Sequence, residues 1–241
     1  MLAGFFVCLN MRVILFPLPI SNPSTIAYSS YELDFLKTTK LYFVEKTKTA
    51  RQFIASRKLN IDLNELEFVE IDQKNGSEFQ KEVATLVEKY KQAIVMSESG
   101  CPGVADPGSQ VVAVAHRIGA DVIPLVGPSS IILALMGSGL NGQHFQFHGY
   151  LPIDKQLRNA TLQKLESESW KINCAQLFIE APHRNQALFE AMLERLKPET
   201  RLCVALDLTG EKEWLKTKTI AQWRKNTTVL DKLPTMFIIG K

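Results

Sequence analysis

The sequence predicts an α/β protein with two domains, and three observations support this. The chain has 241 residues, 46% of them hydrophobic, which is enough for one large domain or two small ones. Short runs of Val, Ile, Leu and Phe alternate with segments of helical periodicity, a pattern typical of parallel sheets covered on both faces. A glycine-containing stretch at 137–154 interrupts this alternation, and a second series of strands and helices follows it.

The first domain is expected to span residues 11–140 and to contain a parallel sheet. Apolar runs predict its strands at 12–18, 40–45, 66–71, 93–97 and 121–126. A helix is expected over 28–38. A second helix follows Ser77, a suitable N-cap, and carries apolar residues at helical spacing: Phe79, Val83, Leu86, Val87 and Tyr90.

The second domain is expected to span residues 145–241 and to be smaller, with a mixed sheet. Its strands are predicted at 145–151, 175–181, 201–208 and 235–241. Amphipathic helices are predicted at 158–169 and 185–196. The two domains should therefore meet near residues 140–150.

Charge and cysteine content exclude few functions. The net charge of +3 neither requires nor excludes a nucleic-acid partner. The four cysteines, at positions 8, 101, 174 and 203, form no Cys-x-x-Cys motif. Such scattered cysteines favour reduced thiols in the cytoplasm, and Cys174 and Cys203, within apolar runs, are expected in the core.

The first ten residues are expected to be an extension upstream of the true start at Met11. They are apolar for nine positions, but no basic residue precedes this run and no convincing cleavage site follows it. A membrane-spanning helix needs about 20 apolar residues. Neither a signal peptide nor a membrane anchor is therefore expected.

Three strand ends carry loops rich in Gly, Pro and Ser: "PLPISNPST" at 17–25, "SESGCPGVADPGS" at 97–109 and "VGPSSII" at 126–132. In open α/β sheets, ligands bind beyond the carboxyl ends of the strands. Glycine allows close approach of a ligand to the main chain, and proline fixes the loop shape in advance. One such loop is most simply a tight turn, but three on one edge predict a ligand cleft.

The motifs in these loops exclude two common nucleotide sites. No loop contains the P-loop pattern, and no Gly-x-Gly-x-x-Gly follows a strand. The apolar loop residues Ile20, Val104, Ala105 and Ile131 suit a ligand with a flat apolar ring and few charges.

Four segments together, "SESGCPGVADPGSQVV", "VIPLVGPSS", "HGYLP" and "FIEAPHR", resemble the tetrapyrrole methylase superfamily. Within it they are most similar to the ribosomal RNA small subunit methyltransferase I branch, which methylates a ribose 2′-hydroxyl of 16S rRNA. The resemblance runs from Arg12 to the C-terminus. It implies a class III methyltransferase fold, S-adenosylmethionine bound between two α/β domains, and a homodimer.

The resemblance also implies which residues bind the cofactor. Those of the first domain are Pro19, Ile20, Ser21, Gly100, Cys101, Pro102, Val104, Ala105, Ser129, Ser130 and Ile131. Those of the second domain are Phe178, Ala205, Thr235 and Met236. Cys101 is expected to line the pocket and not to act as a nucleophile, because no base partner can be assigned to it.

Methyl transfer to a ribose needs orientation of the acceptor and can use a base. Candidate catalytic residues are Glu45, Glu180, His183 and Arg184. The alternative is that Glu45 and Glu180 accept hydrogen bonds from loop amides, and that Arg184 pairs with Glu180 or holds a phosphate. No metal is expected, and His144 and His148 are interpreted as solvated or core residues of a strand.

A basic stretch from 37 to 58, in which Glu45 is the only acid, would suit an RNA backbone. The RNA-binding candidates are Lys46, Lys48 and Arg51, with Lys155 and Arg158 after "GYLP". The alternative is an ordinary solvated helix face. A 16S rRNA or small ribosomal subunit partner is expected, and DNA is not.

The chain departs from the family pattern at three places. Leu18–Asn22 replaces Thr-Pro-Ile-Gly-Asn, Val44–Lys48 replaces Ala-Glu-Asp-Thr-Arg, and Ala205–Gly210 replaces Ala-Arg-Glu-Leu-Thr-Lys. The last change removes an arginine and a lysine. Two alternatives therefore stay open: methylation of a small molecule such as a tetrapyrrole, or a non-catalytic module that binds the cofactor or RNA.

Overall fold

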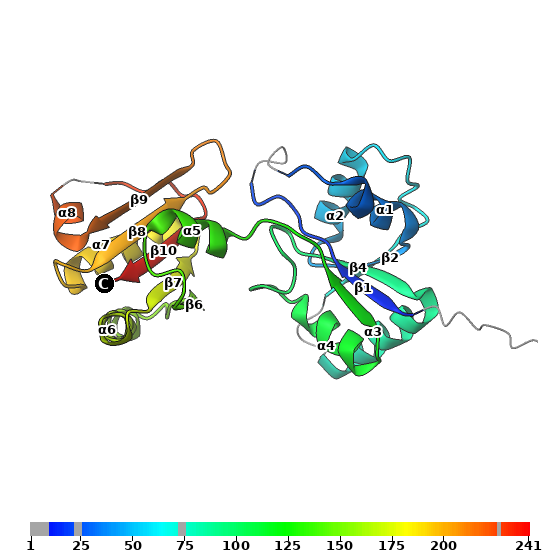
Figure 1. The fold of residues 1–241 in the computed structure, drawn as a ribbon, viewed down its shortest axis with the longest axis horizontal. Helices are drawn as coiled ribbons and strands as arrows, with labels where there is room; N and C mark the ends of the chain where they lie inside the picture. Colours follow the sequence, from blue (N-terminus) through cyan, green and yellow to red (C-terminus); the bar gives the residue numbers. More distant parts are fainter. Residues whose placement is uncertain (1–9, 22–25, 72–75, 226–227) are drawn as a thin grey trace, which may run out of the picture. The chain divides into compact units, whose positions relative to one another are not determined.

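The computed structural model of the chain describes residues 10–21, 26–71, 76–225 and 228–241 (Figure 1). They form two compact units. Unit 1 is the chain up to Pro128 except for the short segment that contains Ile20 and Ser21, and unit 2 is that segment with Ser129–Lys241. The first nine residues, with the predicted extension, lie outside the described residues.

Unit 1 contains a parallel five-stranded sheet in the order β3-β2-β4-β1-β5. Its strands are β1 (Arg12–Leu15), β2 (Leu41–Val44), β3 (Glu67–Glu70), β4 (Gln92–Met96) and β5 (Asp121–Pro124). Its helices are α1 (Ser30–Thr38), α2 (Thr47–Ser56), α3 (Gly76–Tyr90) and α4 (Ser109–Arg117). The expected parallel sheet is confirmed, whereas α3 begins at Gly76, so Ser77 lies inside the helix and is not its cap.

Both faces of this sheet are buried. Val13 and Val95 belong to the core cluster formed with α3 and α4, and their neighbours Ile14 and Ile94 belong to the cluster formed with α1 and α2. Figure 1 shows these two pairs of helices on opposite sides of the sheet. All four side chains are fully buried. Continuous apolar strands are the consequence of this double covering, because successive side chains alternate between two dry faces.

Unit 2 contains a mixed sheet in the order β6-β7-β10-β8-β9, as expected. Its strands are β6 (Phe145–Tyr150), β7 (Ala175–Glu180), β8 (Arg201–Leu206), β9 (Trp214–Thr219) and β10 (Thr235–Gly240). Its helices are α5 (Ser130–Ser138), α6 (Lys155–Ile172), α7 (Asn185–Arg195) and α8 (Ile220–Arg224), with a 3-10 turn η2 (Pro182–Arg184). Only β6 and β7 run parallel; the other three pairs are antiparallel.

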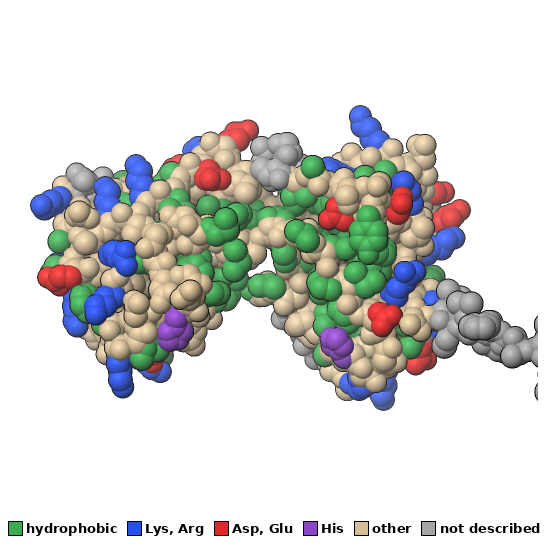
Figure 2. All heavy atoms as spheres, viewed as in Figure 1, with side chains coloured by type: hydrophobic (Ala, Val, Ile, Leu, Met, Phe, Trp, Pro, Cys, Tyr) green, Lys and Arg blue, Asp and Glu red, His purple; other side chains and the backbone are tan. Residues whose placement is uncertain are grey.

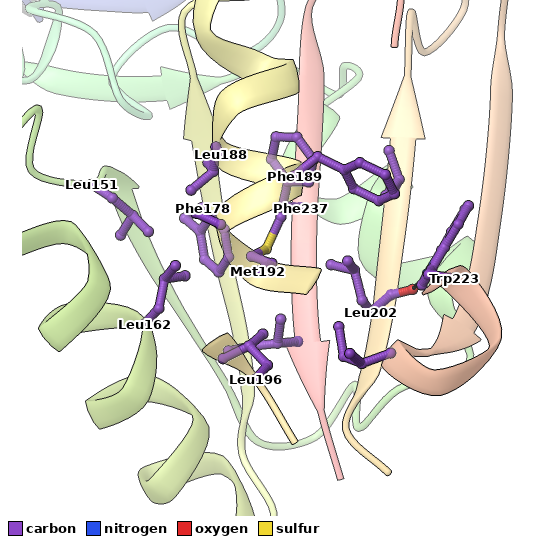
Figure 3. Packing of buried hydrophobic residues seen from close by; sticks show 14 of the residues in the cluster. Leu151, Leu162, Phe178, Leu188, Phe189, Met192, Leu196, Leu202, Trp223 and Phe237 are labelled. Carbon is purple, nitrogen blue, oxygen red and sulfur yellow. Dashed lines mark hydrogen bonds between the residues drawn. The ribbon is translucent and has the colours of Figure 1, made fainter. Parts of the chain in front are cut away.

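The two faces of the second sheet have separate cores. On one face, α6, α7 and α8 cover a large cluster in which Phe178 stacks on Phe237 with ring centroids 6.1 Å apart (Figure 3). In the same cluster the rings of Phe189 and Trp223 meet edge to face. On the other face, α5 packs against a smaller cluster that includes Cys203. Cys174 and Cys203 are both buried, which confirms the core position predicted for them.

The boundary between the units lies at Pro128 and Ser129, earlier than the predicted boundary near residues 140–150. The reason is α5, which follows β5 in sequence but packs against β9 and β10. Its buried residues Ile131, Ala134 and Leu135 belong to the core of unit 2. Within the described ranges, no helix is both long enough and apolar enough to cross a membrane.

Candidate functional site

The loops after β1 and β4 are joined by two main-chain hydrogen bonds. The Leu18 amide donates to the Gly100 carbonyl, and the Gly100 amide donates to the Leu18 carbonyl, each at 3.0 Å. β1 and β4 are parallel neighbours in the sheet, and beyond their carboxyl ends this isolated antiparallel bridge joins the loops that follow them. Two of the three loops predicted to form a ligand site therefore meet.

The third loop, after β5, closes on the same place. The Cys101 thiol donates a hydrogen bond of 3.2 Å to the Pro128 carbonyl. A Cβ on Gly127 would overlap the ring of Pro17 and lie 3.6 Å from the Cys101 sulfur. Gly127 is therefore needed for the close approach of the three loops, and the prediction that they lie on one edge is confirmed for unit 1.

The loop at 97–109 is held by its own polar groups. The Ser97 hydroxyl donates to the carbonyls of Ser99 and Gly100, and the Gly108 amide donates to Asp106 Oδ1 at 2.6 Å. Asp106 Oδ2 is buried and has no hydrogen-bond partner among the described residues. Its neighbours on the loop, Val104 and Ala105, are exposed, and Ala105 has a φ of 60°. These hydrogen bonds fix the shape of the loop and leave Asp106 Oδ2 as a buried acceptor. Pro102, unlike Val104 and Ala105, is buried.

Glu45 lies at the end of β2, beside this loop. Its Oε2 accepts a hydrogen bond of 2.5 Å from the Glu98 amide. Burial raises the pKa of the Glu45 carboxyl above its ordinary value of 4.5, and the negative charges of Asp106 and Glu98 raise this pKa further. The hydrogen bond from the Glu98 amide and the positive charge of Lys46 lower it, but they do not cancel the rise. Glu45 thus accepts a loop amide, as one interpretation expected, and also has the raised pKa useful in a base.

Sequence reasoning did not identify Glu98 and Asp106, although both lie in the quoted loop. The glycines and prolines there attracted attention, whereas the acids look like ordinary loop residues. Burial also raises the pKa of the Cys101 thiol, with a further contribution from Asp106. This keeps Cys101 protonated and agrees with a lining role.

In unit 2, the segment with Ile20 and Ser21 contacts the turn after β8. The Ser21 amide donates to Thr209 Oγ1 at 3.2 Å, and the Ser21 hydroxyl donates to Asp207 Oδ1 at 3.4 Å. Asp207 is nearly buried. The Ala205–Gly210 stretch that departs from the family pattern is therefore the partner of the first loop's Ser21.

The other predicted cofactor residues of unit 2 differ in accessibility. Ser129 and Ser130 begin α5, and the Ser129 side chain makes no capping hydrogen bond. Ile131, Ala205 and Met236 are buried on the α5 face of the sheet. Phe178 is fully buried on the opposite face (Figure 3), so its side chain cannot line an open site.

Glu180, at the end of β7, is an ion-pair residue. Its Oε1 accepts hydrogen bonds from Arg184 Nη2 at 2.5 Å, from Arg184 Nε at 2.9 Å and from the Ala181 amide at 2.7 Å. The Glu180 side chain is 0% exposed, and its buried Oε2 has no hydrogen-bond partner in the part of the chain that the structure describes. Of the two roles considered for Arg184, pairing with Glu180 is observed. His183 is exposed in the η2 turn.

A third polar residue missed by sequence reasoning, Asn185, lies close to this pair. Asn185 is fully buried and donates from Nδ2 to the Thr235 hydroxyl and to the Leu233 carbonyl. Thr235 is paired with Glu180 in the sheet, so the side chains of both residues lie on the same face. Thr235, a predicted cofactor residue, is thereby engaged in the protein's own hydrogen bonds.

The predicted RNA-binding residues divide into two kinds. Lys46 forms an ion pair of 2.7 Å with Glu98, and Arg51 donates to the Leu63 carbonyl and lies over the Phe68 ring. Lys48 and Lys155 are exposed, while Arg158 is half-buried and its Nε atom has no hydrogen-bond partner within the described ranges. On the face shown in Figure 2, Lys and Arg side chains are scattered within each unit and do not form one continuous band.

The two histidines with i, i+4 spacing lie near the sheet edge of unit 2. His144 precedes β6 and its Nδ1 is 3.2 Å from the Ile172 carbonyl, while His148 Nε2 is 2.6 Å from Gln176 Oε1. Among the residues that the structure describes, no group of three or more His, Cys, Asp or Glu could hold a metal ion.

Comparison with curated proteins finds relatives over most of the chain. It is 29% identical over 206 residues to the ribosomal RNA small subunit methyltransferase I of Vibrio cholerae, covering 86% of this chain and 68% of the relative. It is also 29% identical over 215 residues to the protein of the same name from Buchnera aphidicola subsp. Schizaphis graminum, covering 87% and 70%. No family model matches the chain.

Solved structures with a similar fold include methyltransferases and a synthase. Diphthine synthase matches with a TM-score of 0.63 at 14% identity, covering 95% of this chain and 90% of that one. The methyltransferase CobJ matches with 0.60 at 16% identity, covering 95% and 93%. Uroporphyrin-III C-methyltransferase from Thermus thermophilus, complexed with S-adenyl homocysteine, matches with 0.56 at 15% identity, covering 95% and 97%. The predicted fold and the resemblance drawn from the motifs are confirmed.

Proposed function

We propose that the protein is an S-adenosylmethionine-dependent methyltransferase whose acceptor is a ribose 2′-hydroxyl of 16S rRNA. The observation that carries this proposal is the meeting of the β1, β4 and β5 loops at one edge of the unit 1 sheet. This is the edge at which α/β sheets bind ligands. The similarity to ribosomal RNA small subunit methyltransferases I supports the choice of acceptor.

The three loops fit a cofactor that is recognised mainly through the main chain. Gly127 lets Pro17 pack directly against the β5 loop, and the Leu18–Gly100 bridge holds the adjoining loops in place. Pro19, Gly100, Cys101, Val104 and Ala105 are the residues of unit 1 proposed to contact it. From unit 2 the candidates are Ile20, Ser21, Ser129, Ser130, Ile131, Ala205 and Met236.

When bound, S-adenosylmethionine supplies a methyl group on a sulfonium, whose leaving group is a neutral thioether. The protein's main task is then to align the acceptor oxygen with the S–CH₃ bond at about 3–3.5 Å. A side chain that takes the hydroxyl proton adds a further contribution of about 10²–10⁴-fold.

We propose Glu45 as that base. It is half-buried, its pKa is raised, and Oε2 is fixed by the Glu98 amide while Oε1 has no hydrogen-bond partner among the described residues. A carboxylate with a raised pKa is a stronger base than an ordinary one. The geometry of Glu180 supports a different role: its carboxylate is enclosed and paired, so it is proposed to hold Arg184 and the η2 turn in place.

The exposed cations are proposed to contact the RNA backbone. Lys48 on α2 and Lys155 on α6 form no ion pair with any residue that the structure describes, unlike Lys46, so they can neutralise phosphates without breaking such a contact. Arg184 presents a quarter of its side chain to solvent while it pairs with Glu180, which leaves one face for a phosphate. A ribosomal RNA acceptor would place the protein in the cytoplasm, and the resemblance supports a homodimer, which light scattering would measure.

Two experiments test the function. Calorimetry with S-adenosylmethionine should show binding at one site per chain. Methyl transfer from labelled cofactor should label 16S rRNA in 30S subunits from a host that lacks this modification, and should not label tetrapyrroles. Binding without labelling of 16S rRNA would refute the RNA acceptor, and labelling of a tetrapyrrole would establish the small-molecule alternative. Absence of cofactor binding would refute the methyltransferase itself.

Glu45→Gln tests the base. The substitution should lower kcat about 10²–10⁴-fold and leave the Kd for the cofactor unchanged, because the amide keeps the shape but cannot accept a proton. Glu88→Gln, at an exposed position of α3, is the matched control and should behave as wild type. A Glu45→Gln enzyme with wild-type kcat would exclude Glu45 as the base.

A further inference from the structure

The sheet of unit 2 has a second end, away from the strand ends that lead to Glu180 and Asp207. This second end is formed by Arg201, Thr219 and Gly240, which are paired across β8, β9 and β10. At about 3.4 Å per residue, the two ends of β8 lie about 17 Å apart. The lysines on the elements that meet at this second end form a distal surface, which consists of Lys171, Lys197, Lys218, Lys225 and Lys241.

Two lysines of the distal surface are held beside one indole ring. Lys197 Nζ and Lys241 Nζ lie 5.4 Å and 5.7 Å from the centroid of the Trp170 ring, whose face attracts cations. Trp170 Nε1 donates to Thr200 Oγ1 at 3.0 Å, and the Thr200 hydroxyl donates to Glu166 Oε1 at 2.5 Å. The buried Glu166 also accepts a hydrogen bond of 2.7 Å from the Lys197 amide. A buried network therefore fixes the main chain that carries this part of the surface.

The segment from β9 to α8 adds Lys218 and Lys225 at the same end of the sheet. The Ile220 amide donates to the Thr200 carbonyl at 2.9 Å, so α8 begins beside the loop that precedes β8. Lys218 Nζ lies 4.8 Å from the centroid of the Trp223 ring. Lys225 directly follows α8 and is exposed. The distal surface therefore gathers lysines that are up to 70 residues apart in the chain.

The lysines of the distal surface have no internal counter-charges. None of the five forms an ion pair with a residue that the structure describes, whereas Lys164, Arg195 and Lys212 of unit 2 are paired with carboxylates. Glu199, in the loop before β8, is exposed and likewise forms no ion pair within the described ranges. Figure 2 shows most Lys and Arg side chains of unit 2, in separate groups, toward the side where Figure 1 places α6, α8 and the C-terminus. Gathered like charges repel one another, so an anionic partner would bind favourably here.

We propose that the distal surface binds phosphates of the RNA backbone outside the acceptor nucleotide, as a second point of contact with the substrate. The inference rests on the proposed function for its choice of RNA. Lysine ammonium groups neutralise phosphates without reading the sequence, so this contact contributes affinity and orientation and not base selection. Surfaces that bind RNA strands combine cations with aromatic rings, as Lys197, Lys241 and Trp170 do. Because about 17 Å separate the ends of β8, only an RNA longer than one nucleotide can contact both.

The salt dependence of RNA binding tests the proposal without methyl transfer. The triple variant Lys197→Gln, Lys218→Gln, Lys241→Gln removes three charges and keeps side chains of similar length. In filter binding to protein-free 16S rRNA, its slope of log K against log salt should be less steep than the wild-type slope by about 2–3. The ratio of the variant's Kd to the wild-type Kd should therefore fall about 20- to 40-fold between about 50 and 200 mM salt. The corresponding triple Lys→Arg variant should keep the wild-type slope, because the charges are retained.

The matched control is Lys81→Gln, Lys89→Gln, Lys91→Gln, which removes the same charge from exposed positions on and beside α3. It should keep the wild-type slope. An equal loss of slope in both triple variants would show a general effect of net charge and overturn the proposal, as would an unchanged slope in the distal variant. If thermal unfolding shows that the lost ring contacts destabilise the distal variant, Lys171→Gln, Lys225→Gln serves instead. Neither of these two lysines lies over a ring of the described residues, and the slope should then be less steep by about 1–2.

Methyl transfer separates this inference from the proposed function. With 30S subunits, the distal triple variant should show a raised KM, an unchanged kcat and an unchanged Kd for S-adenosylmethionine. Labelling of 16S rRNA with the wild-type KM and salt slope would refute the distal surface and leave the methyltransferase intact. A reduced slope in a protein that labels no 16S rRNA would refute the RNA methyltransferase and retain the RNA contact. Weaker binding of 30S subunits with unchanged binding of protein-free 16S rRNA would assign the surface to a ribosomal protein and overturn the proposal.

Discussion

Gly127→Ala tests whether the three loops of unit 1 form one pre-shaped edge. The new methyl group would overlap Cβ and Cγ of Pro17 and touch the Cys101 sulfur at 3.6 Å. Pro17 cannot yield by rotation, because its ring is closed onto the main chain. Its carbonyl also accepts a hydrogen bond of 2.9 Å from the Tyr28 hydroxyl, whose ring stacks on Phe16. The β1 and β5 loops must therefore separate.

The size of the effect follows from this overlap. Overpacking in a fixed environment costs about 1–3 kcal/mol. At about 2–4 °C per kcal/mol for a chain of this size, the melting temperature should fall by about 2–12 °C. If cofactor binding must restore the original edge, the same free energy should weaken the Kd for S-adenosylmethionine by about 5- to 150-fold.

The assay pairs thermal unfolding with calorimetry on the intact chain. Gly142→Ala is the matched control, because nothing lies within 4 Å of its added Cβ and the exchange of glycine for alanine is the same. Stability and cofactor affinity of Gly127→Ala equal to those of Gly142→Ala would refute the account of the edge. Loss of stability with an unchanged Kd would show that the edge is structural and that the cofactor binds elsewhere.

Three further predictions follow from single contacts. Because folding raises the pKa of Glu45, the folded state binds the Glu45 proton more tightly, so the free energy of unfolding should fall as pH rises above 4.5. Denaturant titrations of Glu45→Gln should lack this pH-dependent component. Identical pH profiles of stability for the wild type and Glu45→Gln would contradict the prediction. Arg51→Ala should destabilise the protein by about 1 kcal/mol, because the hydrogen bond to the Leu63 carbonyl is lost. Lys48→Ala should leave the stability unchanged and weaken RNA binding. Equal losses of stability in the two variants would show that both cations are structural. Cys101 should react with iodoacetamide at pH 7 more slowly than a free cysteine, because burial holds its thiol protonated. Mass spectrometry would follow the reaction, and a rate equal to that of a free thiol would contradict the prediction.

Much of unit 1 was predictable because burial on both sides leaves a simple pattern. The three inner strands of its sheet, β2, β4 and β1, are apolar runs, and the loops that meet at its edge carry glycine and proline in sequence. β9 was not predicted because "WLKTKT" is an edge strand whose lysines alternate with its other residues, so it lacks an apolar run. The boundary was misplaced because α5 continues the first series in sequence while its apolar face packs in unit 2.

The candidate site was less predictable than the fold, since pairing over long sequence distances decides which charges are free. Lys46 and Glu98 are separated by 52 residues and pair only when β2 and β4 lie side by side. Glu180 and Arg184 are close in sequence, but burial of the carboxylate is set by β10 and α7. Residue type alone could not distinguish a base from a buried counterion at this position.

The pair of hydrogen bonds between Leu18 and Gly100 forms an isolated antiparallel bridge beyond the regular parallel strands. The amides of Leu18 and Gly100 lie in loops, but they should consequently exchange with deuterium as slowly as the amides of β1 and β4, even with no ligand present. The conformational entropy of the two loops is then lost when the protein folds and not when a ligand binds, so a ligand would bind to loops that are already ordered.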